Sequence, residues 1–170
     1  MSETELKLSV SEHNLEAAHQ WLLAKGAQPS GAPLSLRNRD FDTPDGQLNR
    51  ERVALRLRET GDQVIQTLKT RGHMQAGAME REEWEWTLNE PSLDLGLLET
   101  TPLAGHPALN QLVHCFDTDF ERRVLDLSEV SGEGAVTEIE CALDKGVIRT
   151  GEAEVPLLEV ELELKSGDAL

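Results

Sequence analysis

Alternating apolar and polar residues recur along most of this chain, and a period of two is typical of β-strands that bury one face. The alternation predicts strands at residues 3–10, 34–42, 79–88, 118–127, 135–144 and 154–164. Residues 53–72 predict a β-hairpin, because two alternating runs flank the turn-forming segment 60–62, which reads Thr-Gly-Asp. We therefore expect seven to nine strands, mostly paired in antiparallel hairpins.

A helical period is confined to two parts of the sequence. Ser11 is a suitable N-cap, apolar residues recur at helical spacing over residues 15–23, and Gly26 is a typical C-terminal glycine. A second, locally helical region is expected around residues 92–114, where Pro107 would stand at a helix start. The pattern predicts an antiparallel α+β fold whose sheet is either open or closed into a barrel.

The polar faces of the predicted strands are ionic, and their charges are sorted by sign. The middle strands carry basic residues at alternate positions, and the first and last strands carry glutamates. A solvated face, the usual partner of a core face, normally mixes Ser, Thr, Gln, Lys and Glu. The sorting favours a barrel with an ionic interior. The basic set is Arg56, Arg58, Lys69, Arg81 and Arg122, and the acidic set is Glu3, Glu5, Glu159, Glu161 and Glu163.

These residue types are suited to phosphate chemistry. Arginine offers a planar fork for phosphate oxygens, and lysine offers a point charge. Carboxylate oxygens are hard ligands that favour Mg²⁺ or Mn²⁺, and Mg²⁺ commonly bridges protein carboxylates to substrate phosphates. The combination predicts a site for phosphoryl transfer, which depends on positioning and on neutralising charge.

Composition limits the classes of partner. The formal net charge of −16 argues against a nucleic-acid or anionic membrane surface as a partner. No apolar run approaches the roughly 18 residues of a membrane-spanning helix, and no signal-peptide pattern is present. Cys115 and Cys141 have no metal-ligand spacing, so free, buried thiols and a cytoplasmic location are expected.

The motifs resemble those of the CYTH domains, which are triphosphate tunnel metalloenzymes. The resemblance spans essentially the whole chain in order, and it is closest to the bacterial inorganic triphosphatases. It implies a single domain over residues 1–170 with an eight-stranded antiparallel tunnel, at the N-terminal end of a longer protein that carries a CHAD domain. The matching segments are "ETELK" at 3–7, "FDTPDGQL" at 41–48, "ALRLR" at 54–58, "TLKTRG" at 67–72, "REEW" at 81–84, "FERR" at 120–123, "ALDKG" at 142–146 and "LLEVELELKSGD" at 157–168.

The resemblance also implies roles for single residues. Lys7 and Asp144 are the catalytic candidates, Arg39 with Arg37 would reach the tunnel mouth, and Glu83 and Glu140 would pair with arginines. Metal ligation is implied for Glu3, Glu5, Glu159, Glu161 and Glu163 with Mg²⁺ or Mn²⁺, and phosphate binding for Lys7, Arg56, Arg58, Lys69, Arg81 and Arg122.

The implied reaction is metal-dependent hydrolysis of inorganic triphosphate to pyrophosphate and phosphate. Class IV adenylate cyclase, thiamine or nucleoside triphosphatase, and a non-catalytic polyphosphate-binding module are the alternatives. Aromatic residues make up 4% of the chain and tyrosine is absent, so the sequence offers no evident shelf for a base or a thiazole ring. The four glutamates Glu3, Glu5, Glu161 and Glu163 favour catalysis over simple binding.

Overall fold

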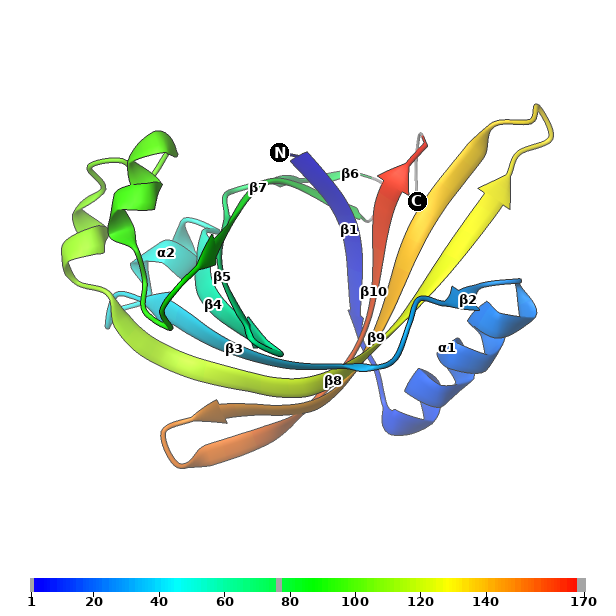
Figure 1. The fold of residues 1–170 in the computed structure, drawn as a ribbon, viewed down its shortest axis with the longest axis horizontal. Coiled ribbons are helices and arrows are strands. Elements are labelled where there is room, and N and C mark those ends of the chain that lie inside the picture. The colour runs from blue at the N-terminus through cyan, green and yellow to red at the C-terminus, as the bar shows by residue number, and fades with distance from the viewer. Residues whose placement is uncertain (1, 76–77, 168–170) are drawn as a thin grey trace.

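Eight antiparallel strands close into a barrel in the computed structural model, which describes residues 2–75 and 78–167 (Figure 1). The order around the barrel is β1-β10-β9-β8-β3-β4-β5-β7, and pairing of β1 with β7 closes the ring. The closed barrel confirms the eight-stranded prediction. The strands are β1 (Ser2–Ser9), β3 (Leu34–Asp42), β4 (Ala54–Thr60), β5 (Gln63–Lys69), β7 (Ala78–Leu88), β8 (Val113–Val130), β9 (Val136–Thr150) and β10 (Ala153–Ser166).

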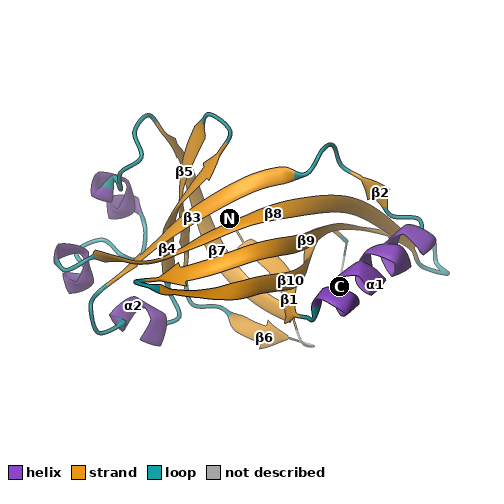
Figure 2. Ribbon diagram, turned by 90° about the horizontal axis from the view of Figure 1, so that it is seen from below, coloured by secondary structure: helices purple, strands orange, loops and turns teal. Residues whose placement is uncertain are grey.

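The remaining elements lie outside this ring. Strand β2 (Gln28–Pro29) pairs with β8, and β6 (His73–Gln75) pairs with β7. The helices are α1 (Glu12–Ala24) and α2 (Gln47–Arg50), and the expected helical region at 92–114 holds two 3₁₀ helices, Leu95–Thr100 and Pro107–Asn110. In Figure 2, α1 lies at one end of the barrel, and α2 and the 3₁₀ helices gather at the other. No helix in the described ranges has the length and apolarity to cross a membrane.

Helix α1 covers the outer face of β8, β9 and β10. Its N-cap is the predicted one, because the Ser11 hydroxyl accepts a hydrogen bond from the Asn14 amide at 3.1 Å. Gly26 ends the helix with a φ of 98°, a left-handed conformation that glycine adopts without steric cost. Leu15 and Leu22 are the buried residues of the helix. They pack with Ala27, Leu125, Leu127, Cys141, Leu143 and Val160, which we call the α1 cluster.

A second apolar cluster covers the outer face of β4, β5 and β7. The indoles of Trp84 and Trp86 pack against it. The 3₁₀ helices and α2 supply the other side. The buried members of this 3₁₀ cluster are Leu48, Leu55, Leu68, Leu98, Leu103 and Ala108. Because both large clusters lie on outer faces of the strands, the inner faces are free to carry charge.

The segment "FDTPDGQL" forms the turn between β3 and α2. The Asp42 carboxylate accepts hydrogen bonds from the amides of Thr43 at 2.7 Å, Leu48 at 2.8 Å and Asn49 at 3.0 Å. The hydroxyl of Thr43 accepts from the amide of Gln47 at 2.9 Å. The segment that carries much of the family resemblance is therefore a capping structure that ends one strand of the barrel.

The two cysteines are free thiols, as predicted. Cys141 is fully buried in the α1 cluster, whereas Cys115 is only partly buried. Burial raises the pKa of both thiols, so neither is activated as a nucleophile.

Candidate active site

A cavity of about 460 Å³ runs through the inside of the barrel. Its walls are the alternate, inward-facing residues of all eight strands, as the period-two pattern predicts. Twelve of the thirteen predicted site residues line it: Glu3, Glu5, Lys7, Arg56, Arg58, Lys69, Arg81, Arg122, Asp144, Glu159, Glu161 and Glu163.

Strand register places the predicted metal ligands beside one another. Glu5 of β1 lies opposite Glu163 of β10, and Lys7 lies opposite Glu161. Glu5 and Glu161 are buried, at 5% and 9% exposed. Glu3 is also inward, at the β1–β7 seam. The ETELK segment is therefore an inner wall of the barrel and not a solvated edge.

The Lys69 ammonium holds the carboxylates of this wall together. Its Nζ lies 2.8 Å from Glu3 Oε1, 3.5 Å from Glu5 Oε2 and 3.9 Å from Glu83 Oε2. Burial raises the pKa of Glu3, and a hydrogen bond to Glu83 raises it further. Burial likewise raises the pKa of Glu5, against the opposing charge of Lys69. The wall therefore holds more negative charge than one ammonium neutralises.

On the neighbouring wall, Arg122 and Asp144 form a two-pronged ion pair. Arg122 Nε and Nη2 donate to the two carboxylate oxygens of Asp144, each at 2.8 Å. Burial would lower the pKa of Arg122, but the bonds to Asp144 raise it on balance. Arg122 Nη2 also lies 3.7 Å from Glu161 Oε2. Burial would raise the pKa of Glu161, yet the charges of Lys7 and Arg122 hold it below its ordinary value, so Glu161 is ionised at neutral pH.

Strand β4 supplies two further guanidiniums. Arg58 Nε donates to Asn38 Oδ1 at 2.8 Å, which fixes the plane of that fork. Burial and the charges of Arg56 and Arg122 lower the pKa of Arg58 to about 9, which leaves it charged at neutral pH. Arg56 Nε is buried and has no hydrogen-bond partner among the described residues. An unsatisfied buried donor of this kind is suited to an anionic acceptor from outside the protein.

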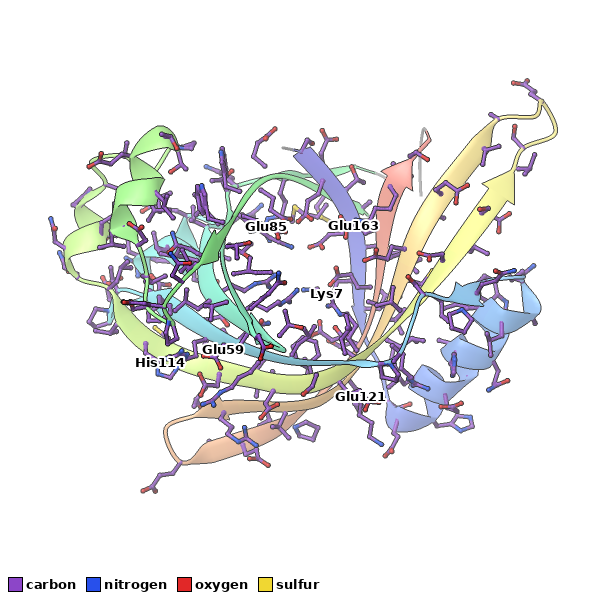
Figure 3. All side chains as sticks on the ribbon, in the orientation of Figure 1. Lys7, Glu59, Glu85, His114, Glu121 and Glu163 are labelled. Atoms are coloured by element: carbon purple, nitrogen blue, oxygen red, sulfur yellow. The ribbon has the colours of Figure 1, made fainter. Side chains whose placement is uncertain are left out.

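Lys7 stands in the open part of the cavity. Its side chain is 45% exposed although it is inside the barrel, and its Nζ lies 3.6 Å from Glu161 Oε2. Figure 3 labels Lys7 inside the ring of strands, with Glu85 and Glu163 near its rim. Lys7 is therefore reachable by a ligand, in contrast to the buried Lys69.

Arg81 and Arg39 differ from the other predicted phosphate ligands. Arg81 lines the cavity, but its guanidinium donates to the backbone carbonyls of Thr70 at 3.2 Å and Arg52 at 3.3 Å. Arg39 does not line the cavity: its Nη2 donates to Glu59 at 2.7 Å and to the Pro91 carbonyl. The expectation that Arg39 reaches the tunnel mouth is corrected: Asn38 and Asp40 are the residues of β3 that face the cavity, and Arg39 lies on the opposite face of the strand.

The inward residues of β3 were missed by the sequence reasoning, as was the aromatic part of the wall. Asn38 and Asp40 line the cavity from β3, and Phe116 and Phe120 line it from β8. Phe120 packs with Leu36, Leu157 and Ile148 in a third apolar cluster that forms part of the cavity wall. The alternation of residues 118–127 could have identified Phe120, because Phe120 is two positions from the predicted site residue Arg122 and so shares its face of the strand.

The carboxylate oxygens of the cavity are the type of ligand that divalent cations such as Mg²⁺ prefer, but in the described part of the chain their arrangement does not form a metal site. Within residues 2–75 and 78–167, no three His, Cys, Asp or Glu side chains are placed to hold a metal ion. Among the described residues, however, Glu5 Oε2 has no hydrogen-bond partner although it is buried, and burial raises the pKa of Glu159 and Glu163. Burial removes water from these carboxylates, and such desolvated oxygen atoms are favourable ligands for a hard cation.

Comparisons with known proteins agree with this geometry. A family model described as the CYTH domain matches residues 1–170. The inorganic triphosphatase of Haemophilus influenzae is 34% identical over 170 residues, which are 99% of this chain and 46% of that protein. The chain thus spans about half the length of this curated relative.

Solved structures share the fold. The Hippeastrum protein HpAC1, described as a candidate adenylyl cyclase with a dominant triphosphatase activity, aligns with a TM-score of 0.56 at 21% identity, over 96% of this chain and 80% of its own. The PH1819 protein of Pyrococcus horikoshii aligns with a TM-score of 0.57 at 15% identity, over 98% of this chain and 79% of its own. At these identities the likeness concerns the barrel alone.

Proposed function

This chain belongs to the CYTH domain family, and on that basis we propose that it hydrolyses inorganic triphosphate to pyrophosphate and phosphate inside the barrel. The observation that carries the proposal is the composition of the cavity wall. Partly buried guanidiniums and the buried Lys69 share a cavity of about 460 Å³ with buried and partly buried carboxylates. A relative that is 34% identical is an inorganic triphosphatase.

The basic residues would bind the phosphate chain. Arg58 and Arg122 are held in fixed orientations by Asn38 and Asp144, so their forks are preorganised for phosphate oxygens. Arg56 offers an unsatisfied N–H to the same space. Lys69 and Arg81 would add positive charge near the acidic wall, although both already have protein partners.

Lys7 is the proposed catalytic residue that a substrate can reach, because its ammonium stands in the open cavity. Beside Glu161, this ammonium would donate hydrogen bonds that orient a water or a phosphate oxygen near the terminal phosphoryl group. Both oxygens of Asp144 accept hydrogen bonds from Arg122. We therefore assign Asp144 the role of holding Arg122 in position.

A divalent cation, Mg²⁺ or Mn²⁺, would be held by Glu3, Glu5, Glu159, Glu161 and Glu163. When bound, it would neutralise charge on the phosphate chain and lower the pKa of a water. The carboxylates would have to rearrange, because Lys69 and Lys7 now form ion pairs with three of them.

The test is release of phosphate from triphosphate, ATP and thiamine triphosphate, each with Mg²⁺, Mn²⁺ or EDTA. We expect turnover of triphosphate well above the others and none in EDTA. Glu5→Gln should lower the rate of triphosphate turnover at least about 100-fold, because it removes a charged ligand from the acidic wall.

Glu121→Gln is the matched control, because Glu121 is an exposed residue of β8 that is absent from the cavity wall. It should leave turnover unchanged. Wild-type rates in Glu5→Gln, with an unchanged melting temperature, would contradict the proposed role of the acidic wall.

Hydrolysis or cyclisation of an organic triphosphate is the second candidate function. The specific observation in its favour is the pair Phe116 and Phe120, which give the cavity the aromatic surface that the composition did not predict. Phe116→Ala separates the two functions: it should spare triphosphate turnover, and it should raise the KM for ATP only if a base stacks on this wall.

A further inference from the structure

Asp40 is an acidic residue on the basic side of the cavity. It lines the cavity from β3, directly opposite Arg56 of β4 in the strand register. Within residues 2–75 and 78–167 its carboxyl makes no hydrogen bond and no ion pair within 4 Å. Asp144, the other aspartate of the wall, differs because both of its oxygens bind Arg122.

The charges that face Asp40 come from three strands. Arg56 and Arg58 of β4 and Lys7 of β1 favour its ionised form, and Asp117 of the neighbouring β8 opposes it. Burial outweighs the three cations and raises the pKa of Asp40 to about 6. The charge of Asp40 also contributes to the raised pKa of the Cys115 thiol, although burial is the larger cause. Asp40 is thus mostly ionised at pH 7 but is close to accepting a proton.

A polyanion that binds Arg56 and Arg58 would offset the positive charge that favours the ionised form of Asp40. The same ligand would place several negative charges beside the Asp40 carboxylate, and like charges at this range disfavour the ionised form. A protonated Asp40 can instead donate its O–H to a phosphate oxygen. The site therefore becomes more favourable to a phosphate chain when Asp40 carries a proton.

We propose that Asp40 takes up a proton when a phosphate chain binds, and so couples the affinity of the cavity for polyphosphate to pH. The proposal rests on the proposed function of the cavity as a triphosphate site. Asp40 acts here as a specificity and affinity residue, and the reaction itself does not require it.

The direction of the pH effect follows from linkage. A group that gains a proton on binding makes the ligand bind more weakly as pH rises above the pKa of the free protein. The dissociation constant should rise by up to about tenfold for each unit by which binding raises the pKa of Asp40. Below about pH 5, Asp40 is already protonated in the free protein, so the effect should vanish.

The experiment is calorimetric titration of inorganic triphosphate in EDTA, from pH 5 to pH 8, in two buffers of different ionisation enthalpy. EDTA prevents turnover if the reaction needs a metal. Wild type should take up more protons at pH 7 than Asp40→Asn, by up to about one. Asp40→Asn should bind as well as wild type at pH 5 and more tightly at pH 8. Asp40→Ser is a second variant that removes the same carboxyl.

Asp119→Asn is the matched control, because it removes the same charge from β8 outside the cavity, where Asp119 pairs with Arg149. It should reproduce the wild-type proton uptake and pH profile. If wild type and Asp40→Asn both bound triphosphate and took up the same number of protons, the proposed role of Asp40 would be overturned. The proposal of a triphosphate site would be unaffected. No binding of triphosphate by wild type at any pH in EDTA would overturn the proton coupling, and the triphosphate site itself would be overturned if the same protein also failed to turn over triphosphate with Mg²⁺ or Mn²⁺.

Discussion

Single residues show how the cavity keeps buried charge in a defined geometry. Asp144 is 3% exposed, and each of its oxygens accepts from the Arg122 guanidinium at 2.8 Å. Such a pair adds little net stability over apolar residues, but removing one partner leaves the other buried and unpaired. The value of the pair lies in the fixed direction of the Arg122 fork.

Truncation of this pair has a measurable signature. Arg122→Ala should lower the free energy of unfolding by about 3–5 kcal/mol, because it leaves Asp144 buried without its partner. The double variant Arg122→Ala with Asp144→Ala should lose less than the sum of the two single variants. Urea denaturation of all four proteins measures this coupling. Strict additivity would show that the two side chains do not depend on each other.

At the scale of elements, the capping turn after β3 fixes where the strand ends. The Asp42 carboxylate satisfies three backbone amides, and Thr43, only 1% exposed, satisfies a fourth. These bonds replace the intrahelical partners that the first turn of α2 lacks. The polar residues Asp42 and Thr43 of "FDTPDGQL" thus bind the backbone, Leu48 packs in the 3₁₀ cluster, and none of the segment's side chains lines the cavity.

Asp42→Ala should therefore destabilise the fold by about 1–3 kcal/mol, the cost of leaving buried donors without acceptors. Asp45→Ala is the control from the same turn, because Asp45 is exposed and its carboxylate bonds to the side chains of Thr43 and Arg50. Its effect should be clearly smaller than that of Asp42→Ala, because water screens an exposed carboxylate. Thermal melts compare the two variants, and equal losses would mean that the carboxylate of Asp42 is not the essential cap.

The strands also show how far the sequence could predict the site. Where one face of a strand is apolar, as in "ALRLR", alternation assigns the inward residues correctly. In "RNRD" both faces are polar, so parity is ambiguous, and the inward residues are Asn38 and Asp40 and not the arginines. The sequence also could not predict the ion pairs, because partners such as Lys69 and Glu3 or Glu5 are far apart in the chain.

The molecule as a whole combines a cavity wall that carries charges of both signs with a large excess of acidic residues over the whole chain. The formal net charge is −16, and like charges of this density repel one another in the folded state. The screening length falls from about 30 Å at 0.01 M salt to about 10 Å at 0.1 M, which shortens the range of that repulsion. Salt should therefore stabilise this protein.

We expect the melting temperature at pH 7.5 to rise as NaCl is raised from about 0.01 M to about 0.3 M, where repulsion is screened. At pH 5, where carboxylates begin to gain protons, the rise should be smaller. A fall in melting temperature with salt would show that the attractive ion pairs of the cavity and surface outweigh the net repulsion.

The two largest apolar clusters lie against the outside of the barrel, under α1 and under the 3₁₀ helices. The outer faces of the strands thus supply most of the apolar packing, and the inner faces of the same strands supply the charged groups of the cavity. A mutation of an inward residue leaves most of the buried apolar contacts intact, so the interior can exchange both partners of an ion pair, such as Arg122 and Asp144, while the scaffold remains. This separation makes the architecture permissive to evolutionary divergence: lineages can exchange one anionic ligand for another while they inherit the same shell.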